Sequence, residues 1–107
     1  MVAKNINKEE FRMLVEGTKP VLVDFWAPWC SYCRRIGPAY EKIAEQFDQT
    51  LEVVKVNIDE EPQLAQAERI EVIPTLVLYR DGQALGSVVA PESKTAIDGF
   101  IRQTLEM

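Results

Sequence analysis

The sequence predicts an α/β protein in which a central mixed β-sheet is flanked by helices, in the order β-α-β-α-β-α-β-β-α. Short apolar runs alternate along the chain with segments whose apolar residues recur at helical spacing. This alternation is typical of a sheet covered by helices. The early crossovers should be parallel and right-handed, whereas the Asp81-Gly82 turn should join two antiparallel strands.

Length and composition indicate one globular domain over residues 1–107. Apolar residues make up 47% of the chain and charged residues 27%, which is the usual mix for a soluble protein. The formal net charge is −5, and this balance argues against nucleic acid or a membrane surface as the main partner. The first residues carry no apolar signal segment, and no run approaches the length of a membrane span. We therefore expect a cytoplasmic protein.

The first third of the chain predicts a capped helix followed by a buried strand. Asn7 can cap the helix, Glu10 stands three residues later, and Gly17 ends it. The strand from Val21 to Trp26 is apolar on both faces, as expected in the middle of a sheet. The apolar face of the helix consists of Phe11, Leu14 and Val15.

The middle of the chain predicts a long helix, a strand and a short helix. A turn at residues 27–33 leads into the long helix, and Pro38 should kink it by removing one hydrogen bond. A strand follows from Leu51 to Ile58, and Pro62 suits the first position of the next helix. The apolar face of the long helix consists of Ile36, Tyr40, Ile43, Ala44 and Phe47.

The last third predicts a hairpin and a final helix. One strand runs from Thr75 to Tyr79, and the chain returns from Gln83 to Val89. Ser93 can cap the final helix. Its apolar face consists of Ile97, Phe100, Ile101 and Leu105.

Cys30 and Cys33 are the only cysteines, and they form a C-x-x-C motif where a strand gives way to a helix. Cys30 falls at the helix N-terminus, where unpaired N–H groups and the helix dipole favour a thiolate. Cys33 lies one turn inside and should be more buried. We therefore expect Cys30 to attack a disulfide and Cys33 to resolve the mixed disulfide.

Two structural interpretations compete with this redox hypothesis. The pair could be half of a zinc site, but zinc needs four ligands and the chain has no histidine and no further cysteine. The pair could also be a static disulfide, but closing so small a loop gains little chain entropy. The absence of histidine also excludes Ser-His-Asp and Cys-His catalytic groups.

An ionisable residue, Asp24, interrupts the apolar run that leads to the cysteine turn. Burial there would raise the pKa of Asp24, and the carboxyl could then relay protons to and from Cys33. Alternatively, Asp24 lies at a strand edge and faces water. Lys55 interrupts its own strand in the same way, as a counter-charge to Asp24 or as a solvated lysine.

These features together resemble the thioredoxin family from Val2 to the last helix. The segment FWAPWCSYC at residues 25–33 is similar to the family's signature. Asp24 and Lys55 stand where thioredoxins carry a buried aspartate and its lysine neighbour. The other matches are the kink proline, the cis-proline loop and the late hairpin, at Pro38, Ile73-Pro74-Thr75 and Asp81-Gly82.

The resemblance implies a thioredoxin fold and the reduction of protein disulfides by dithiol–disulfide exchange. Cys30 and Cys33 would be the nucleophile and the resolving thiol, Asp24 would manage the proton and Lys55 would tune it. We expect a monomer that needs no cofactor beyond this cysteine pair and is recharged by thioredoxin reductase. The expected substrate groove is lined by Trp29, Ser31, Tyr32, Ile73, Pro74, Val89, Ala90 and Pro91.

The chain departs from the family pattern around the predicted site. Ser31-Tyr32 replaces Gly-Pro, Val72 replaces glycine and Ala90-Pro91 replaces Gly-Ala. We expect Tyr32 to place a backbone donor and an aromatic ring beside Cys30. Two alternatives follow: a more oxidising exchanger of isomerase or glutaredoxin type, or a dimer that binds a metal or an iron–sulfur cluster through paired C-x-x-C motifs.

Overall fold

A five-stranded mixed sheet forms the middle of the fold. The computed structural model of the chain describes residues 3–107. The strands are β1 (Lys4–Asn5), β2 (Val21–Trp26), β3 (Glu52–Asn57), β4 (Thr75–Arg80) and β5 (Gln83–Val89). Their order in the sheet is β1-β3-β2-β4-β5, with β3 parallel to both neighbours and β4 antiparallel to both of its own. The predicted mixed sheet is confirmed, with β2 at its centre.

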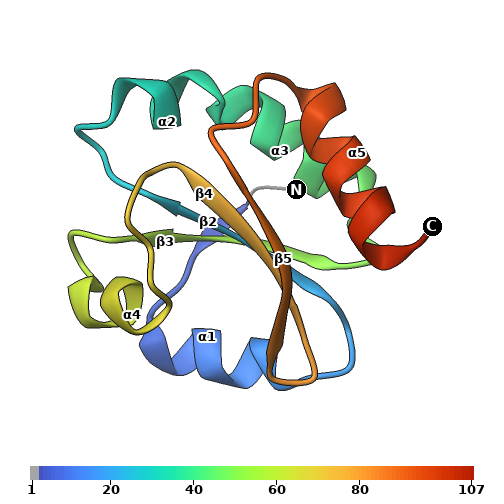
Figure 1. Cartoon of the computed structure of the whole chain (residues 1–107), viewed down its shortest axis with the longest axis horizontal. Coiled ribbons are helices and arrows are strands. Elements are labelled where there is room, and N and C mark those ends of the chain that lie inside the picture. Colours follow the sequence, from blue (N-terminus) through green and yellow to red (C-terminus); the bar gives the residue numbers. More distant parts are fainter. Residues whose placement is uncertain (1–2) are drawn as a thin grey trace.

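Helices cover both faces of the sheet (Figure 1). They are α1 (Lys8–Val15), α2 (Ser31–Arg35), α3 (Gly37–Gln46), α4 (Pro62–Ala67) and α5 (Lys94–Leu105). Figure 1 shows α1 and α4 on one side of the sheet and α3 and α5 on the other. A short turn over residues 27–30 joins the end of β2 to the short helix α2, so the central strand leads to the cysteine pair.

The strand β2 supplies side chains to two separate cores because successive residues point to opposite faces. Leu22 belongs to the core beneath α3 and α5, whereas Val21 and Val23 belong to the core beneath α1 and α4. The first core also contains Tyr40, Ile43, Leu76, Leu78, Ile97 and Ile101. Since Asp24 follows Leu22 by two residues, its side chain lies on the face covered by α3 and α5.

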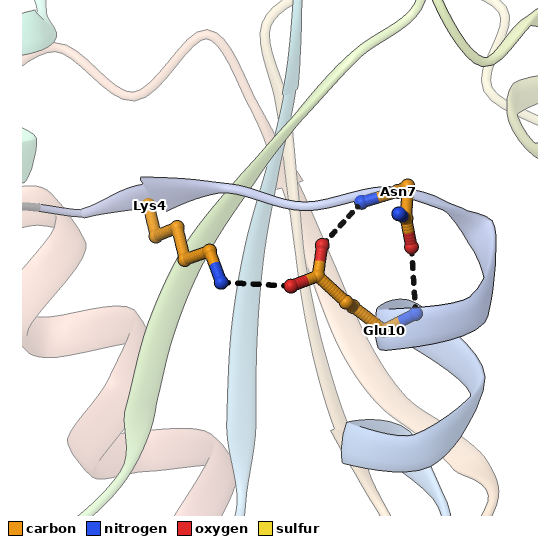
Figure 2. A network of polar contacts seen from close by, with 3 residues as sticks. All are labelled: Lys4, Asn7 and Glu10. Carbon is orange, nitrogen blue, oxygen red and sulfur yellow. Dashed lines mark hydrogen bonds and ion pairs between the residues drawn. The ribbon is translucent and has the colours of Figure 1, made fainter.

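The first helix begins with the predicted cap (Figure 2). The side chain of Asn7 accepts from the N–H of Glu10 at 2.9 Å, and the Asn7 N–H donates to the Glu10 carboxylate at 3.0 Å. Lys4 of β1 donates to the other Glu10 oxygen at 2.7 Å, which lowers the pKa of Glu10. The cap therefore also ties α1 to the edge strand.

The predicted long helix is divided in two. We expected one kinked helix across Pro38, but α2 ends at Arg35 and α3 begins at Gly37. Pro38 has no N–H to donate to the carbonyl of Arg34 four residues earlier, so the ladder is interrupted there. The Ile36 N–H donates to the carbonyl of Tyr32 at 3.1 Å and closes α2.

The predicted hairpin turn and the predicted first residues of the last two helices are also found in the structure. Asp81 and Gly82 have φ values of 55° and 78°, the left-handed conformation that a tight hairpin between β4 and β5 requires. The Ser93 side chain accepts from the N–H of Ala96 at 3.1 Å and caps α5. Pro62 is the first residue of α4. Within residues 3–107, the helices are too short or too polar to cross a membrane.

Candidate active site

The two cysteines form a disulfide at the N-terminus of α2, with their Cα atoms 5.2 Å apart. Cys30 is the N-cap residue and has an extended backbone, with φ −88° and ψ 108°. Its sulfur accepts from the N–H of Cys33 at 3.2 Å. Cys30 is half-buried, whereas Cys33 is only 4% exposed. The prediction that Cys33 is more buried than Cys30 is confirmed for the two residues.

A tight turn between β2 and α2 positions Cys30. The Cys30 N–H donates to the carbonyl of Ala27 at 3.1 Å, and the Cys30 carbonyl accepts from the N–H of Arg34 at 3.2 Å. The guanidinium of Arg34 reaches back to the carbonyl of Pro28 at 2.7 Å. Both ends of the turn that carries Cys30 are therefore fixed by hydrogen bonds.

Asp24 lies in the centre of the sheet and is 3% exposed. Its Oδ1 atom is buried and has no hydrogen-bond partner among residues 3–107. This desolvation raises the pKa of Asp24 to about 7, although the positive charge of Lys55 opposes the rise. The prediction of a buried aspartate with a raised pKa is confirmed, and the alternative of a solvent-facing position at a strand edge is wrong.

Lys55 is half-buried on β3, directly opposite Asp24 in the parallel register. Its ammonium group lies over the indole ring of Trp26, 4.9 Å from the ring centroid. This cation–π contact engages the ammonium group. The charge of Lys55 also attracts the Asp24 carboxylate, which lowers the pKa of Asp24.

Tyr40 is a residue near Asp24 that the sequence pattern assigns only to the core. Its ring is fully buried, and its hydroxyl lies 2.6 Å from the carbonyl oxygen of Val54 and 3.1 Å from that of Leu22. Burial and the Asp24 charge raise the pKa of Tyr40 well above its usual value. Helical spacing predicted this burial, but it carries no information about where the hydroxyl points.

The loop before β4 lies beside the disulfide. The Ile73-Pro74 peptide bond is cis, as the family resemblance implied. The Ile73 carbonyl oxygen lies 4.0 Å from the Cys30 sulfur. The Ala90 N–H donates to the carbonyl of Pro74 at 2.9 Å, so the chain after β5 is also brought to this place.

Exposed apolar side chains come from three segments that meet around Cys30. The exposed fractions are 66% for Trp29, 52% for Val72 and 53% for Val89. The Trp29 indole N–H donates to Asp59 at 3.1 Å, a contact that the sequence did not indicate because the two residues are 30 positions apart. Trp29 is therefore held at the surface next to Cys30 in the sequence.

The two residues between the cysteines differ in their surroundings. Ser31 is exposed, and Tyr32 is half-buried against the core under α3 and α5. The Tyr32 hydroxyl donates toward the carbonyl of Pro91 at 3.0 Å. We expected the Tyr32 N–H to act as the donor near the Cys30 sulfur, but the N–H that contacts this sulfur belongs to Cys33.

The chemistry available to this arrangement is that of the cysteine pair. Within residues 3–107, His, Cys, Asp and Glu side chains form no group of three that could hold a metal ion. An accessible sulfur at a helix N-terminus, a second sulfur within bonding distance and a buried carboxyl of raised pKa suit thiol–disulfide exchange.

Comparison with known proteins gives the same result. The family model described as Thioredoxin matches residues 2–103. Thioredoxin 1 of Synechococcus elongatus is 43% identical over 97 residues, which cover 90% of this chain and 91% of the relative. Thioredoxin 1 of Nostoc is 45% identical over 93 residues, which cover 87% and 83%.

Known structures agree with the sequence relatives. Malassezia sympodialis thioredoxin superposes with a TM-score of 0.87 at 34% identity, covering 97% of this chain and 90% of that one. Oxidised mitochondrial thioredoxin 3 of Saccharomyces cerevisiae gives 0.82 at 31% identity, covering 95% and 94%. The chain belongs to the thioredoxin family of thiol–disulfide oxidoreductases.

Proposed function

We propose that this thiol–disulfide oxidoreductase works as a reductase of protein disulfides. The observation that carries the proposal is the position of Cys30. Cys30 is a half-buried residue at a helix N-terminus, and the segments next to it carry the exposed apolar side chains of Trp29, Val72 and Val89. An accessible sulfur with an apolar surround suits an attack on a disulfide carried by another protein. The alternatives of a more oxidising exchanger and of a metal-bridged dimer are not favoured by relatives that are thioredoxins.

The proposed reaction moves two electrons from the reduced cysteine pair to the substrate. The Cys30 thiolate attacks one substrate sulfur, the substrate disulfide breaks, and the released substrate thiolate takes up a proton. Cys33 then loses its proton and attacks the Cys30 sulfur of the mixed disulfide. The second substrate thiolate leaves and is protonated, while Cys30 and Cys33 form the disulfide found in the structure.

Asp24 is the proposed acceptor of the Cys33 proton. Both groups are almost completely buried, at 3% and 4% exposure, so bulk water has little access to that proton. A carboxyl whose pKa is about 7 can take up and release a proton near neutral pH. Lys55 adjusts this pKa through its charge and is a positioning residue in the proposed mechanism.

The proposed substrate is an extended segment that carries the disulfide. It would lie across the exposed side chains of Trp29 and Val89, with its backbone next to the Ile73 carbonyl beside the Cys30 sulfur. The other groove residues proposed to line this path are Ser31, Tyr32, Pro74, Ala90 and Pro91.

The proposed partners follow from the family. A thioredoxin reductase would return the Cys30–Cys33 disulfide to its dithiol form, and disulfide-bearing proteins would be the substrates. We propose that residues 1–107 act as one domain and one monomer in the cytoplasm. The exchange itself needs no cofactor besides the cysteine pair.

An insulin-reduction assay with NADPH and a thioredoxin reductase tests the proposal. We expect the wild type to reduce insulin, Cys30→Ser to be inactive and Cys33→Ser to accumulate mixed disulfides, because the resolving step is lost. Retained turnover in Cys30→Ser would contradict the assignment of the nucleophile. Failure of the wild type to reduce insulin even when it is chemically reduced beforehand would contradict protein-disulfide reduction itself.

A further inference from the structure

Tyr32 connects the cysteine helix to the chain that follows β5. Its hydroxyl lies 3.0 Å from the carbonyl oxygen of Pro91 and 3.5 Å from that of Ala90. The single phenol proton can form one well-aligned hydrogen bond, and the shorter distance indicates that the Pro91 carbonyl is its acceptor. The ring is also fixed, because it packs against the core and the Arg35 guanidinium lies over it, 5.6 Å from the centroid. The hydroxyl is therefore presented to this segment by a side chain with little freedom.

The segment from Val89 to Pro91 has a conformation that needs support. Ala90 has a φ of 46°, which is unfavourable for a residue with a Cβ atom. Its N–H donates to the carbonyl of Pro74 at 2.9 Å, and Val89 pairs with Thr75 in the sheet. The pairing with β4 and the bond to the proline loop thus hold Val89 and Ala90. The hydrogen bond from the Tyr32 hydroxyl to the Pro91 carbonyl holds the end of the segment that lies next to α2.

These contacts join the segments that surround the Cys30 sulfur. The Ile73 carbonyl lies 4.0 Å from this sulfur, and Val89 exposes half of its surface next to the strained Ala90. An extended substrate needs both surfaces in fixed positions, because it contacts them at the same time. A small disulfide needs only access to Cys30.

We propose that Tyr32 is a specificity-determining residue, whose hydroxyl fixes the Val89–Pro91 segment so that the site favours disulfides in extended polypeptide over small disulfides. The proposal rests on the proposed function and names the feature that selects its substrates. Tyr32 acts through the segment and is a positioning residue.

The test compares Tyr32→Phe with wild type on two substrates, insulin and hydroxyethyl disulfide, using protein reduced beforehand. Loss of one neutral hydrogen bond should lower the second-order rate constant for the single-turnover reduction of insulin about fivefold. The rate with hydroxyethyl disulfide should fall clearly less than the rate with insulin, and the redox potential should equal that of the wild type. The matched control is Tyr79→Phe, since the Tyr79 hydroxyl donates to Glu68 at 2.7 Å outside the groove. This control should alter neither rate.

Three results would overturn the proposal: an equal fall with both substrates, no fall with insulin, or a shifted potential. Amide hydrogen exchange gives a second measurement that does not depend on activity. The Ala90 N–H should exchange faster in Tyr32→Phe than in wild type, because its segment loses support. Unchanged exchange at Ala90 would overturn the proposal even if the reductase activity is as proposed. Faster exchange in a protein that reduces no insulin would instead count against the proposed function.

Discussion

Asp24 and Lys55 are direct partners in the parallel register of β2 and β3, yet the Lys55 ammonium group lies over the ring of Trp26. The Asp24 carboxyl therefore receives the field of a positive charge without a hydrogen bond to its buried Oδ1 atom. Desolvation dominates over this attraction, and the pKa of Asp24 is raised to about 7. The fold thus keeps a carboxyl that changes its charge near neutral pH.

We expect Asp24→Asn to be more stable than wild type at pH 8 and nearly equal to it at pH 4. Folded Asp24 keeps its proton to about pH 7, whereas the unfolded chain releases it near 3.8. The unfolded state therefore binds fewer protons in this window, and the free energy of unfolding of the wild type falls as pH rises through it. The full change corresponds to roughly 4 kcal/mol. Urea unfolding between pH 4 and pH 8 measures it.

The matched control for this experiment is Glu45→Gln, which makes the same chemical change at an exposed site on α3. It should leave the pH dependence of unfolding as in wild type. Asp24→Asn should also slow insulin reduction at neutral pH, because the proposed acceptor of the Cys33 proton is gone. Equal pH dependence of stability in Asp24→Asn and wild type would show that Asp24 is not the group responsible.

Lys55→Met should raise the pKa of Asp24 further. The change removes the positive charge that lowers this pKa but keeps an alkyl side chain against Trp26. Titration of the Asp24 carboxyl carbon by NMR should therefore show a midpoint above that of the wild type. The window in which stability falls should move to higher pH with it.

Lys42→Met is the control for the Lys55 experiment, since Lys42 is exposed on α3. It removes the same charge from the protein as a whole and should leave the Asp24 midpoint almost unchanged. A midpoint that stays constant or falls in Lys55→Met would mean that the Lys55 field does not reach Asp24.

In the reduced protein, iodoacetamide should modify Cys30 before Cys33 at neutral pH, with a rate about tenfold higher or more. Cys30 is half-buried at the helix N-terminus and its sulfur accepts an N–H bond, whereas Cys33 is 4% exposed. Peptide mass spectrometry after short labelling times identifies the modified residue. Preferential labelling of Cys33 would reverse the proposed roles of the two thiols.

The sequence predicts those parts of the site that depend on local pattern. The burial of Asp24 follows from the apolar residues on both sides of it, and the place of Cys30 at a helix start follows from the strand and turn before it. The hairpin at Asp81-Gly82 is also a local signal, because glycine and aspartate tolerate positive φ.

Contacts between distant residues could not be predicted in this way. The bond from Trp29 to Asp59 and the position of the Lys55 ammonium over Trp26 depend on which loops and strands become neighbours. The Tyr40 hydroxyl is a similar case, because helical spacing specifies a buried ring and leaves its polar atom open. The spacing of apolar residues and the helix or strand propensity of a segment describe one helix or strand at a time. These contacts arise when several helices and strands pack together.

The dipeptide Ser31-Tyr32 should make the protein less reducing than the double variant Ser31→Gly, Tyr32→Pro. Tyr32 has a backbone N–H in the first turn of α2, which proline would remove, and Ser31 adds a hydroxyl. The hydrogen bond from the Cys33 N–H to the Cys30 sulfur does not depend on either residue and should persist in the variant. Neither the Tyr32 N–H nor the Ser31 hydroxyl contacts the Cys30 sulfur in the disulfide form, so we expect both to act at longer range, as dipoles in the first turn of α2 that favour the Cys30 thiolate and so stabilise the reduced form.

We therefore expect the double variant to have a potential more negative by tens of millivolts, where about 30 mV corresponds to about 1.4 kcal/mol for two electrons. Equilibration of both proteins with a glutathione or dithiothreitol buffer measures the difference. The single variant Tyr32→Phe separates the two roles of Tyr32, since it keeps the backbone N–H and loses only the hydroxyl that contacts Pro91. Its potential should equal that of the wild type. If the double variant is equally or less reducing than the wild type, the donor argument is wrong, and Ser31-Tyr32 affects the protein through its choice of substrates alone.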